Sequence, residues 1–229
     1  MLKVLSWNIR QGGGTRVLKI LSKLISFSAE VVVLSEYKNN EAGARIRAGL
    51  LSAGYRYQFV SAAKSSDNSA AIFSKLPGSS LLYPNADADY PHNVLAVDYE
   101  AFKVFGMYLP HKKKHKLFDF LLTEAQSDKP GIMVGDFNTG INGVDQVGNS
   151  FWYEDKMKAL EKAGYRDAFR VKHGPVKAYS WYSHQGNGYR YDHTYVHMRL
   201  VPIIKDCYYI HEWREEKLSD HSPMVLELG

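Results

Sequence analysis

Hydrophobic positions in the first part of the chain follow two different spacings. Two short apolar runs predict buried strands, in "LKVLSW" (2–7) and "EVVVLSE" (30–36). Between these runs, apolar residues recur at the spacing of a helix face: Val17, Leu18, Leu21, Leu24 and Ile25. A second helix is predicted over 41–53, because Gly54 supplies a C-terminal stop. The chain is therefore expected to begin strand, helix, strand, helix.

From Tyr55 onward, short apolar stretches are separated by Pro, Asn, Asp and Gly, a pattern typical of antiparallel strands. Strands are predicted over 55–63, 69–74, 94–100, 102–109, 191–198, 206–211 and 223–228, and within "IMVGDFNTG" (132–140). Helices are predicted near 115–126 and before Gly164. Strands mixed with flanking helices favour an α/β fold of two packed sheets with helices outside, in one domain spanning residues 1–229.

Composition narrows the class of protein. With 45% hydrophobic and 13% aromatic residues, the chain has enough apolar material for a core, which argues against disorder. The longest apolar runs are far shorter than the roughly 20 residues of a membrane span, so a soluble protein without membrane contact is expected. The first residues lack the features of a signal peptide, and Cys207 is the only cysteine. Both observations favour a reducing, cytoplasmic location.

Positive charge is in modest excess. Lys and Arg number 29 against 24 Asp and Glu, and the sequence pI is near 9.0. A basic surface attracts polyanions, although many proteins with this balance never bind nucleic acid. The densest basic stretch is "HKKKHK" (111–116), which is either a solvated loop or a contact for a phosphate backbone.

Polar groups occur where several predicted strands end. They are Asn8, Glu36, Asp136, Asn138, Asp192, His193, Asp220 and His221. Each has an ordinary explanation by itself, such as a turn or an edge charge. Loops at the ends of packed sheets can bring such groups to one point, where the carboxylates would repel each other without a cation. Oxygen ligands suit Mg²⁺ or Mn²⁺ better than zinc, and the pattern therefore predicts a divalent metal site.

The residues of several short motifs, and their order along the chain, are similar to those of one known family. The motifs are "WN" (7–8), "SE" (35–36), "NSAAIFSKLP" (68–77), "MYLP" (107–110), "GDFN" (135–138), "YRD" (165–167), "YRYD" (189–192) and "SDHSP" (219–223). Together they resemble the endonuclease/exonuclease/phosphatase superfamily over residues 4 to 228. The resemblance implies a four-layer α/β sandwich, with two mainly antiparallel sheets face to face and helices on both outer sides. It also implies Mg²⁺-dependent hydrolysis of a phosphoester, with Mn²⁺ as a substitute.

The resemblance also implies roles for particular residues. Glu36 would be the main metal ligand, with Asn8 touching the ion or its water and Asp220 as a further carboxylate. Asp136 would orient or deprotonate the attacking water, and Asn138 would hold that water in line. His221, steadied by Asp192, would stabilise charge on the phosphate, and Tyr108 would donate its phenol to it. Candidate substrate contacts are Lys112, Lys113, Lys114, Trp181 and Arg190.

Several positions depart from the family pattern. Ser35 replaces a frequent Gln, His111 follows "Y-x-P" in place of Asn, and Ser180 stands where a pocket aromatic is usual. The loop 183–188 is too short to carry a helix that penetrates DNA. We therefore expect a monomeric nuclease with an open site acting on DNA, as a 3′-5′ exonuclease or an endonuclease. A phosphodiesterase or phosphatase acting on a small or lipid phosphoester, and a non-catalytic binding protein, remain as alternatives.

Overall fold

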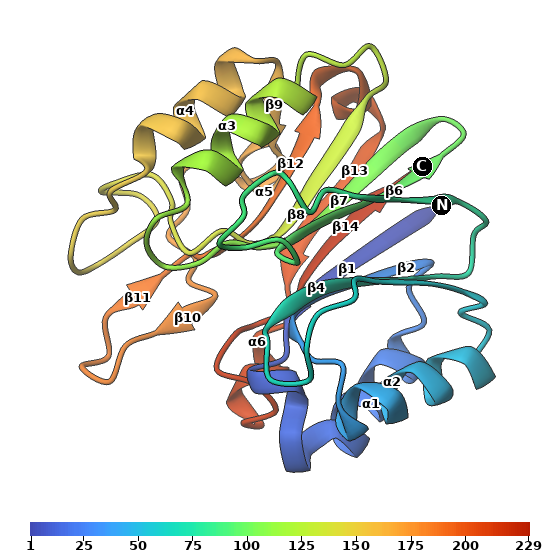
Figure 1. The fold of residues 1–229 in the computed structure, drawn as a ribbon. Coiled ribbons are helices and arrows are strands. Elements are labelled where there is room, and N and C mark those ends of the chain that lie inside the picture. Colours follow the sequence, from blue (N-terminus) through green and yellow to red (C-terminus); the bar gives the residue numbers. More distant parts are fainter.

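The computed structural model describes all residues from Met1 to Gly229 and contains two six-stranded sheets packed face to face (Figure 1). The first sheet has the order β13 (Ile204–Tyr209), β14 (Met224–Leu228), β1 (Leu2–Asn8), β2 (Val31–Tyr37), β4 (Ser69–Ser74), β3 (Tyr57–Val60). The second has the order β5 (Ser79–Leu82), β6 (Val94–Tyr99), β7 (Phe102–Tyr108), β8 (Gly131–Asp136), β12 (Asp192–His197), β9 (Tyr165–Asp167). Only β1/β2 and β7/β8 pair in parallel. The expected four-layer sandwich with mainly antiparallel sheets is confirmed.

Helices cover the two outer faces of this pair of sheets. The helices of the chain are α1 (Val17–Phe27), α2 (Glu41–Ser52), α3 (His115–Glu124), α4 (Glu154–Lys162), α5 (Ala168–His173) and α6 (His211–Glu215). The short helix α5 differs from the others, because its Ala168 and Phe169 belong to the core between the sheets. Two 3₁₀ segments, Gln11–Arg16 and Met198–Ile203, and a small hairpin of β10 (Trp181–Tyr182) and β11 (Gly188–Tyr189) complete the chain. Figure 1 shows α1 and α2 on one outer side and α3 and α4 on the other.

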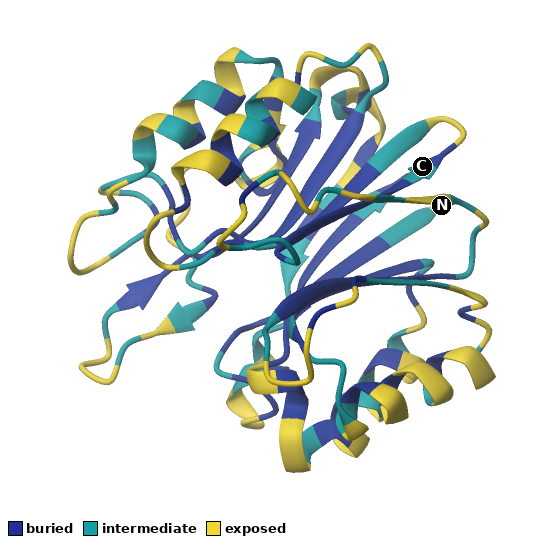
Figure 2. Cartoon of the chain, in the orientation of Figure 1, coloured by how far each residue is buried: buried dark blue, intermediate teal, exposed yellow.

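Alternation along the strands divides the apolar residues among three cores. One core lies between the sheets, where Val33 and Ile72 of the first sheet join Val104 and Val134 of the second. A second packs the first sheet against α1 and α2, and a third packs the second sheet against α3 and α4. In Figure 2 the strands are mostly buried, whereas the helices expose their outer faces. This is the arrangement that period-2 strands and amphipathic helices produce.

Most of the predicted elements are present within a few residues of their predicted bounds. The strand predicted over 55–63 is shorter, because only Tyr57–Val60 pair with β4. The short elements β5, β9, α5, α6 and the β10/β11 hairpin were not predicted. They contain between two and six residues, which is too few for periodicity to reveal them.

The strand ends that carry polar groups meet at one edge of the sandwich. Asn8 at the end of β1 lies opposite Ser35 in β2. In the second sheet, Asp136 at the end of β8 lies opposite both Tyr108 of β7 and Asp192 of β12. The parallel pairs β1/β2 and β7/β8 and the antiparallel pair β8/β12 therefore place these side chains at the same edge.

Candidate active site

Asn8 links carboxylates that come from the two different sheets. Its amide nitrogen donates to Glu36 Oε1 at 3.1 Å and to Asp136 Oδ2 at 2.9 Å. Its amide oxygen accepts the backbone N–H of Arg10 at 2.9 Å, and the side chain is fully buried. Asn8 was predicted to lie at the metal. In this structure it holds the two carboxylates together through its nitrogen, and its oxygen is engaged elsewhere.

Glu36 has an unusual backbone conformation. Its φ is 54°, and the pairing of β2 with β4 shifts between Leu34 and Tyr37. Because of this irregularity, Leu34 and Tyr37 pack into the same helix-facing core although they are three positions apart. A left-handed non-glycine residue costs about 1–3 kcal/mol and persists where the surroundings hold it. Here Glu36 Oε2 accepts the backbone N–H of Gln11 at 2.8 Å, so the carboxylate is fixed at the site.

The turn after β8 presents Asp136 and Asn138 in a way that strand geometry does not produce. The strand ends at Asp136, and Asn138 has a φ of 50°. The Asn138 N–H donates to Asp136 Oδ1 at 2.9 Å, and its amide nitrogen donates to Asp136 Oδ2 at 3.0 Å. A local side-chain turn, and not strand alternation, therefore aligns the two side chains. Phe137 between them is buried.

Gly135 permits the close approach that precedes this turn. Its φ is 148°, and a Cβ atom at this position would lie 2.0 Å from the carbonyl oxygen of Met107. No side chain fits there. Ser35 completes the junction, because its hydroxyl donates to the same Met107 oxygen at 2.8 Å and accepts the Asp136 N–H at 3.3 Å. Ser35, noticed in the sequence only as a departure from the family pattern, thus positions Asp136.

Lys114 is not a substrate contact, contrary to prediction. Its side chain is fully buried, and its ammonium donates to the carbonyl oxygens of Phe137 at 2.8 Å and Asn138 at 2.7 Å. The Tyr153 ring lies 5.1 Å from the same nitrogen. An ammonium with these partners cannot reach a bound strand. Instead Lys114 holds the backbone that carries Asp136 and Asn138.

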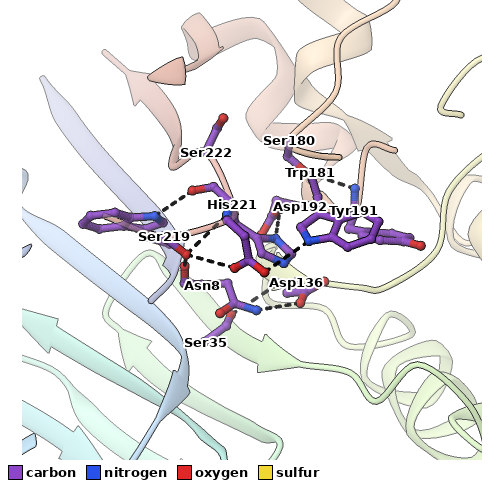
Figure 3. Close-up of polar contacts among 12 residues, drawn as sticks. Asn8, Ser35, Asp136, Ser180, Trp181, Tyr191, Asp192, Ser219, His221 and Ser222 are labelled. Atoms are coloured by element: carbon purple, nitrogen blue, oxygen red, sulfur yellow. Dashed lines mark hydrogen bonds and ion pairs between the residues drawn. The ribbon is translucent and has the colours of Figure 1, made fainter. Parts of the chain in front are cut away.

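Asp192 and His221 form a buried pair next to Asp136. Asp192 Oδ2 lies 2.7 Å from His221 Nδ1, and Asp192 Oδ1 is buried without a hydrogen-bond partner (Figure 3). Ser180 supports the pair, because its hydroxyl accepts the N–H groups of Tyr191 and Asp192 at 3.1 and 3.2 Å. Ser180, like Ser35, was noted in the sequence only as a substitution, and nothing there signalled this role.

The loop that carries His221 is tied to the end of β1. The Ser219 hydroxyl donates to the Asn8 carbonyl oxygen at 2.6 Å and accepts the His221 N–H at 3.2 Å. The Trp7 indole N–H donates to the His221 carbonyl oxygen at 3.0 Å. Residues more than two hundred positions apart therefore share one rigid corner, visible in Figure 3.

Charges at the site shift two pKa values strongly. Burial would lower the pKa of His221, but the Asp192 and Asp136 carboxylates raise it to about 10. Burial raises the pKa of Asp136 to about 7, with Asp192 adding to the rise and His221 and Asn8 opposing it. His221 is thus a cation at neutral pH, and burial moves the pKa of Asp136 from its ordinary value toward neutrality.

Asp220, Trp181 and Tyr108 lie around this centre. The Trp181 indole N–H donates to Asp220 Oδ2 at 3.3 Å, and Arg10 Nε lies 3.7 Å from the same oxygen. Burial and the negative charges of Glu36 and Asp136 raise the pKa of Tyr108. Its phenol therefore stays protonated at neutral pH and lies within the electrostatic reach of both carboxylates.

Arg190 was predicted to contact substrate, and the structure contradicts this. Its side chain is fully buried, with Nε 2.7 Å from Asp145 Oδ1 and a second ion pair to Asp167. Asp167 also caps α5 by accepting the Arg170 N–H, so its role is structural. The side chain of His193 is buried next to this cluster, with Nε2 2.8 Å from the Thr139 carbonyl oxygen.

Of the remaining basic candidates, Lys112 borders an aromatic cavity that was not predicted. Lys112 and Lys113 are exposed, and Lys112 Nζ lies 5.1 Å over the ring of Trp152. The cavity has a volume of about 400 Å³ and is lined by His111, Lys112, Asn138, Thr139, Asn149, Ser150, Phe151, Trp152, Tyr153, Tyr189 and Tyr191. The run "SFWY" (150–153) was the available signal in the sequence.

The donor set suits a hard divalent cation. Carboxylate oxygens of Asp136 and Asp192 lie within 4.8 Å of each other, and the Glu36 carboxylate is joined to Asp136 through Asn8. The unpartnered Asp192 Oδ1 is a buried oxygen that a cation or its water would satisfy. Mg²⁺ prefers such oxygens and keeps several waters, so the residues present fit it.

The two-sheet sandwich carries paired carboxylates at one edge, and a histidine that is hydrogen-bonded to an aspartate lies next to them. This combination of fold and site is typical of enzymes that hydrolyse phosphoesters. The sequence profile described as the Endonuclease/Exonuclease/phosphatase family matches residues 5–221. The chain belongs to that family.

Individual relatives are distant but cover the whole chain. An exodeoxyribonuclease from Streptococcus pneumoniae is 22% identical, over 99% of this chain and 99% of that protein. Among solved structures, a 3′ phosphatase from Neisseria bound to a product DNA hairpin has a TM-score of 0.85 at 22% identity, covering 100% of both chains. A 3′-5′ exonuclease from Neisseria meningitidis has a TM-score of 0.84 at 23% identity, covering 99% of each chain. An AP endonuclease from Archaeoglobus fulgidus reaches 0.80 at 20% identity, covering 100% of this chain and 99% of that one. None of the helices of this protein is long and apolar enough to cross a membrane.

Proposed function

We propose that the protein is a Mg²⁺-dependent deoxyribonuclease that hydrolyses phosphodiester bonds of DNA from a 3′ end or within a strand. The observation that carries this proposal is the buried His221–Asp192 pair facing Asp136, with Glu36 joined to Asp136 through Asn8. Relatives named exodeoxyribonuclease, 3′ phosphatase and AP endonuclease support DNA as the substrate.

Asp136 is the proposed general base. A pKa of about 7 is close to the value at which a carboxylate both exists ionised and accepts a proton efficiently. Asn138 is held against Asp136 by two hydrogen bonds, and its amide oxygen is the proposed group that keeps the attacking water in line. Lys114 and Ser35 keep the backbone of this turn in position.

His221 is the proposed stabiliser of the transition state. A pKa of about 10 keeps the imidazole positive at neutral pH, so it donates a hydrogen bond to a non-bridging phosphate oxygen. Asp192 accepts a hydrogen bond from the Nδ1–H group and fixes the ring. The Tyr108 phenol is a second donor to the phosphate, and its raised pKa prevents its loss of a proton.

Glu36 and Asp220 are the proposed ligands of the metal, with Asn8 orienting the Glu36 carboxylate. When bound, the ion polarises a phosphoryl oxygen and offsets negative charge on the leaving alkoxide. Glu36 is fixed for this task by the Asn8 amide and the Gln11 N–H. Mn²⁺ is expected to substitute for Mg²⁺, because it accepts the same oxygen ligands.

The test is direct hydrolysis. Purified protein is incubated with 3′- and 5′-end-labelled single-stranded, double-stranded and abasic DNA, with Mg²⁺ or with EDTA. A ladder from the 3′ end, internal cuts, or one cut at the abasic position would each support the proposal and define the mode. Undigested DNA under all conditions, together with hydrolysis of a soluble phosphoester, would favour the small-phosphoester alternative instead.

We further propose that the protein acts as a cytoplasmic monomer. Cys207, its single cysteine, is buried and cannot form a disulfide within the chain. Light scattering coupled to gel filtration checks the oligomeric state, with 26.0 kDa expected for the monomer.

A further inference from the structure

A second cavity adjoins the active site on the side of α6. It has a volume of about 510 Å³ and is lined by Arg10, Tyr182, Arg214, Lys217, Ser219 and Asp220. We call these residues the basic rim. They come from the segment after β1, the β10/β11 hairpin, and α6 with the loop that follows it. Asp220 and Ser219 belong also to the active site, so the cavity borders the catalytic centre.

The basic rim concentrates positive charge that the pattern of the sequence did not reveal. Three cations line the cavity, and Asp220 is the only carboxylate among its lining residues. Arg10 Nε lies 3.7 Å from Asp220, and the Arg10 side chain is 59% exposed. Lys217 is exposed, and its φ of 60° places it in a tight turn after α6. Arg10 and Lys217 are therefore accessible to solvent, whereas the predicted basic contact Lys114 is buried.

Arg214 is the preorganised member of the basic rim. Its Nη1 donates to the Tyr179 carbonyl oxygen at 2.9 Å, and its side chain is only 15% exposed. Its guanidinium lies 4.6 Å over the ring of Tyr182, which is itself 45% exposed. Glu215 Oε1 lies 3.9 Å from Nη2, at the edge of ion-pair range. A fixed guanidinium loses little entropy when it binds an oxyanion, and an exposed tyrosine ring offers a face to a base.

We propose that the basic rim binds a backbone phosphate of the substrate strand next to the scissile phosphate, with Tyr182 contacting a base of that strand. This rests on the proposed nuclease function and defines the substrate as a polynucleotide chain, not an isolated phosphoester. The argument is charge complementarity at a hollow that shares Asp220 with the catalytic centre. A linear polyanion that enters the active site and continues across its border meets these three cations.

The test uses Lys217→Ala and Tyr182→Ala, with Lys205→Ala as the matched control. Lys205 is exposed near the chain termini, at the opposite end of β13 from the site. We expect Lys217→Ala to raise the KM for an oligonucleotide by about three- to tenfold. It should also flatten the slope of log(kcat/KM) against log[salt] by about 0.7 to 0.9, as expected for one lost phosphate contact. Tyr182→Ala should raise KM without changing that slope.

Two further measurements distinguish a failure of the basic rim proposal from a failure of the nuclease proposal. Hydrolysis of bis(p-nitrophenyl) phosphate should be unchanged in Lys217→Ala, because this small ester does not reach the basic rim. Lys217→Arg should restore the parent KM and salt slope. If Lys217→Ala and Lys217→Glu both retain the parent KM and salt slope for DNA, the basic rim proposal is wrong and the nuclease proposal stands.

A parent protein that cleaves no DNA refutes the nuclease proposal instead. Fluorescence anisotropy of a labelled oligonucleotide in EDTA then still measures binding at the basic rim. Weaker binding by Lys217→Ala, with Lys205→Ala unchanged, would support the basic rim as a site for nucleic acid. Equal binding by parent and Lys217→Ala would overturn it.

Discussion

Replacing Asp192 with Asn tests the electrostatic core of the site. The Asp192 carboxylate lies 2.7 Å from His221 Nδ1 in a buried environment. The pKa of His221 is about 10, against an ordinary 6.5. One pKa unit corresponds to 1.36 kcal/mol, so the surroundings favour the imidazolium by about 5 kcal/mol. Asp192 is the largest favourable contribution, since burial alone would lower the pKa.

In Asp192→Asn the imidazole of His221 should be largely neutral at pH 8. Loss of that charge, and of the acceptor that fixes the ring, is expected to lower kcat by about 10³-fold at pH 8. The parent should show no titration of His221 between pH 6 and 9. The variant should recover part of its rate as the pH falls through the lowered pKa of His221. Pre-steady-state hydrolysis across this range, with NMR titration of the histidine ring protons, measures both effects.

A second aspartate–histidine pair provides the control. Asp206 Oδ1 lies 3.5 Å from His173 Nε2, and both side chains are partly exposed. Asp206→Asn removes the same charge from a pair outside the site, and it should leave kcat and its pH profile unchanged. A rate for Asp192→Asn within threefold of the parent at pH 8 would refute the proposed role of the Asp192–His221 pair.

Three further changes follow from the same structure. Glu36→Gln should leave the fold intact and abolish Mg²⁺-stimulated hydrolysis. Isothermal titration calorimetry should show weakened Mg²⁺ binding, and an unaltered Mg²⁺ affinity would exclude Glu36 as a ligand. Lys114→Met removes two hydrogen bonds to carbonyls of the catalytic turn, so kcat should fall at least tenfold, with a change in unfolding free energy of about 1–3 kcal/mol in urea titrations. If Lys114→Met retains the kcat of the parent, the catalytic turn does not need Lys114 to keep its conformation. Arg190→Met leaves the buried Asp167 without its arginine and Asp145 with Arg170 alone, and should destabilise the protein by about 3–5 kcal/mol, whereas an unchanged melting temperature would contradict the ion-pair assignment. Burial would raise the pKa of Asp167, but Arg190 more than offsets this and holds it below 3.8. Because the folded pKa is lower, this pair stabilises the fold above about pH 4. The stabilisation is lost as the pH falls through the folded pKa, and acid unfolding of the parent should show this loss.

Several residues at the site have positive φ values, which residues other than glycine rarely adopt. Arg10, Gln11, Glu36 and Asn138 all have positive φ values and all border the paired carboxylates. Each is held by hydrogen bonds to a neighbour in the site, such as Gln11 N–H to Glu36 and Asn138 N–H to Asp136. Strain of this kind is sustained only where surrounding contacts over-determine the geometry. It sets the carboxylates in place before substrate arrives.

The sequence by itself determined the sandwich and its chemically active edge. Period-2 runs and helical spacing depend on which face of an element is buried, and that is a local property of the chain. The long elements were therefore predicted, and the polar residues that end the strands were recognised as one set. Motif order then indicated the family, which the matching profile over residues 5–221 establishes.

Tertiary structure alone decided which polar groups face the site. Lys114 and Arg190 looked like substrate contacts because they are cationic and lie near the motifs, yet each is buried against partners distant in the sequence. The basic rim unites Arg10 with Arg214 and Lys217 from the opposite end of the chain. Hydrogen bonds and ion pairs of this kind depend on three-dimensional proximity. No spacing along the chain encodes that proximity, so only the folded arrangement reveals it.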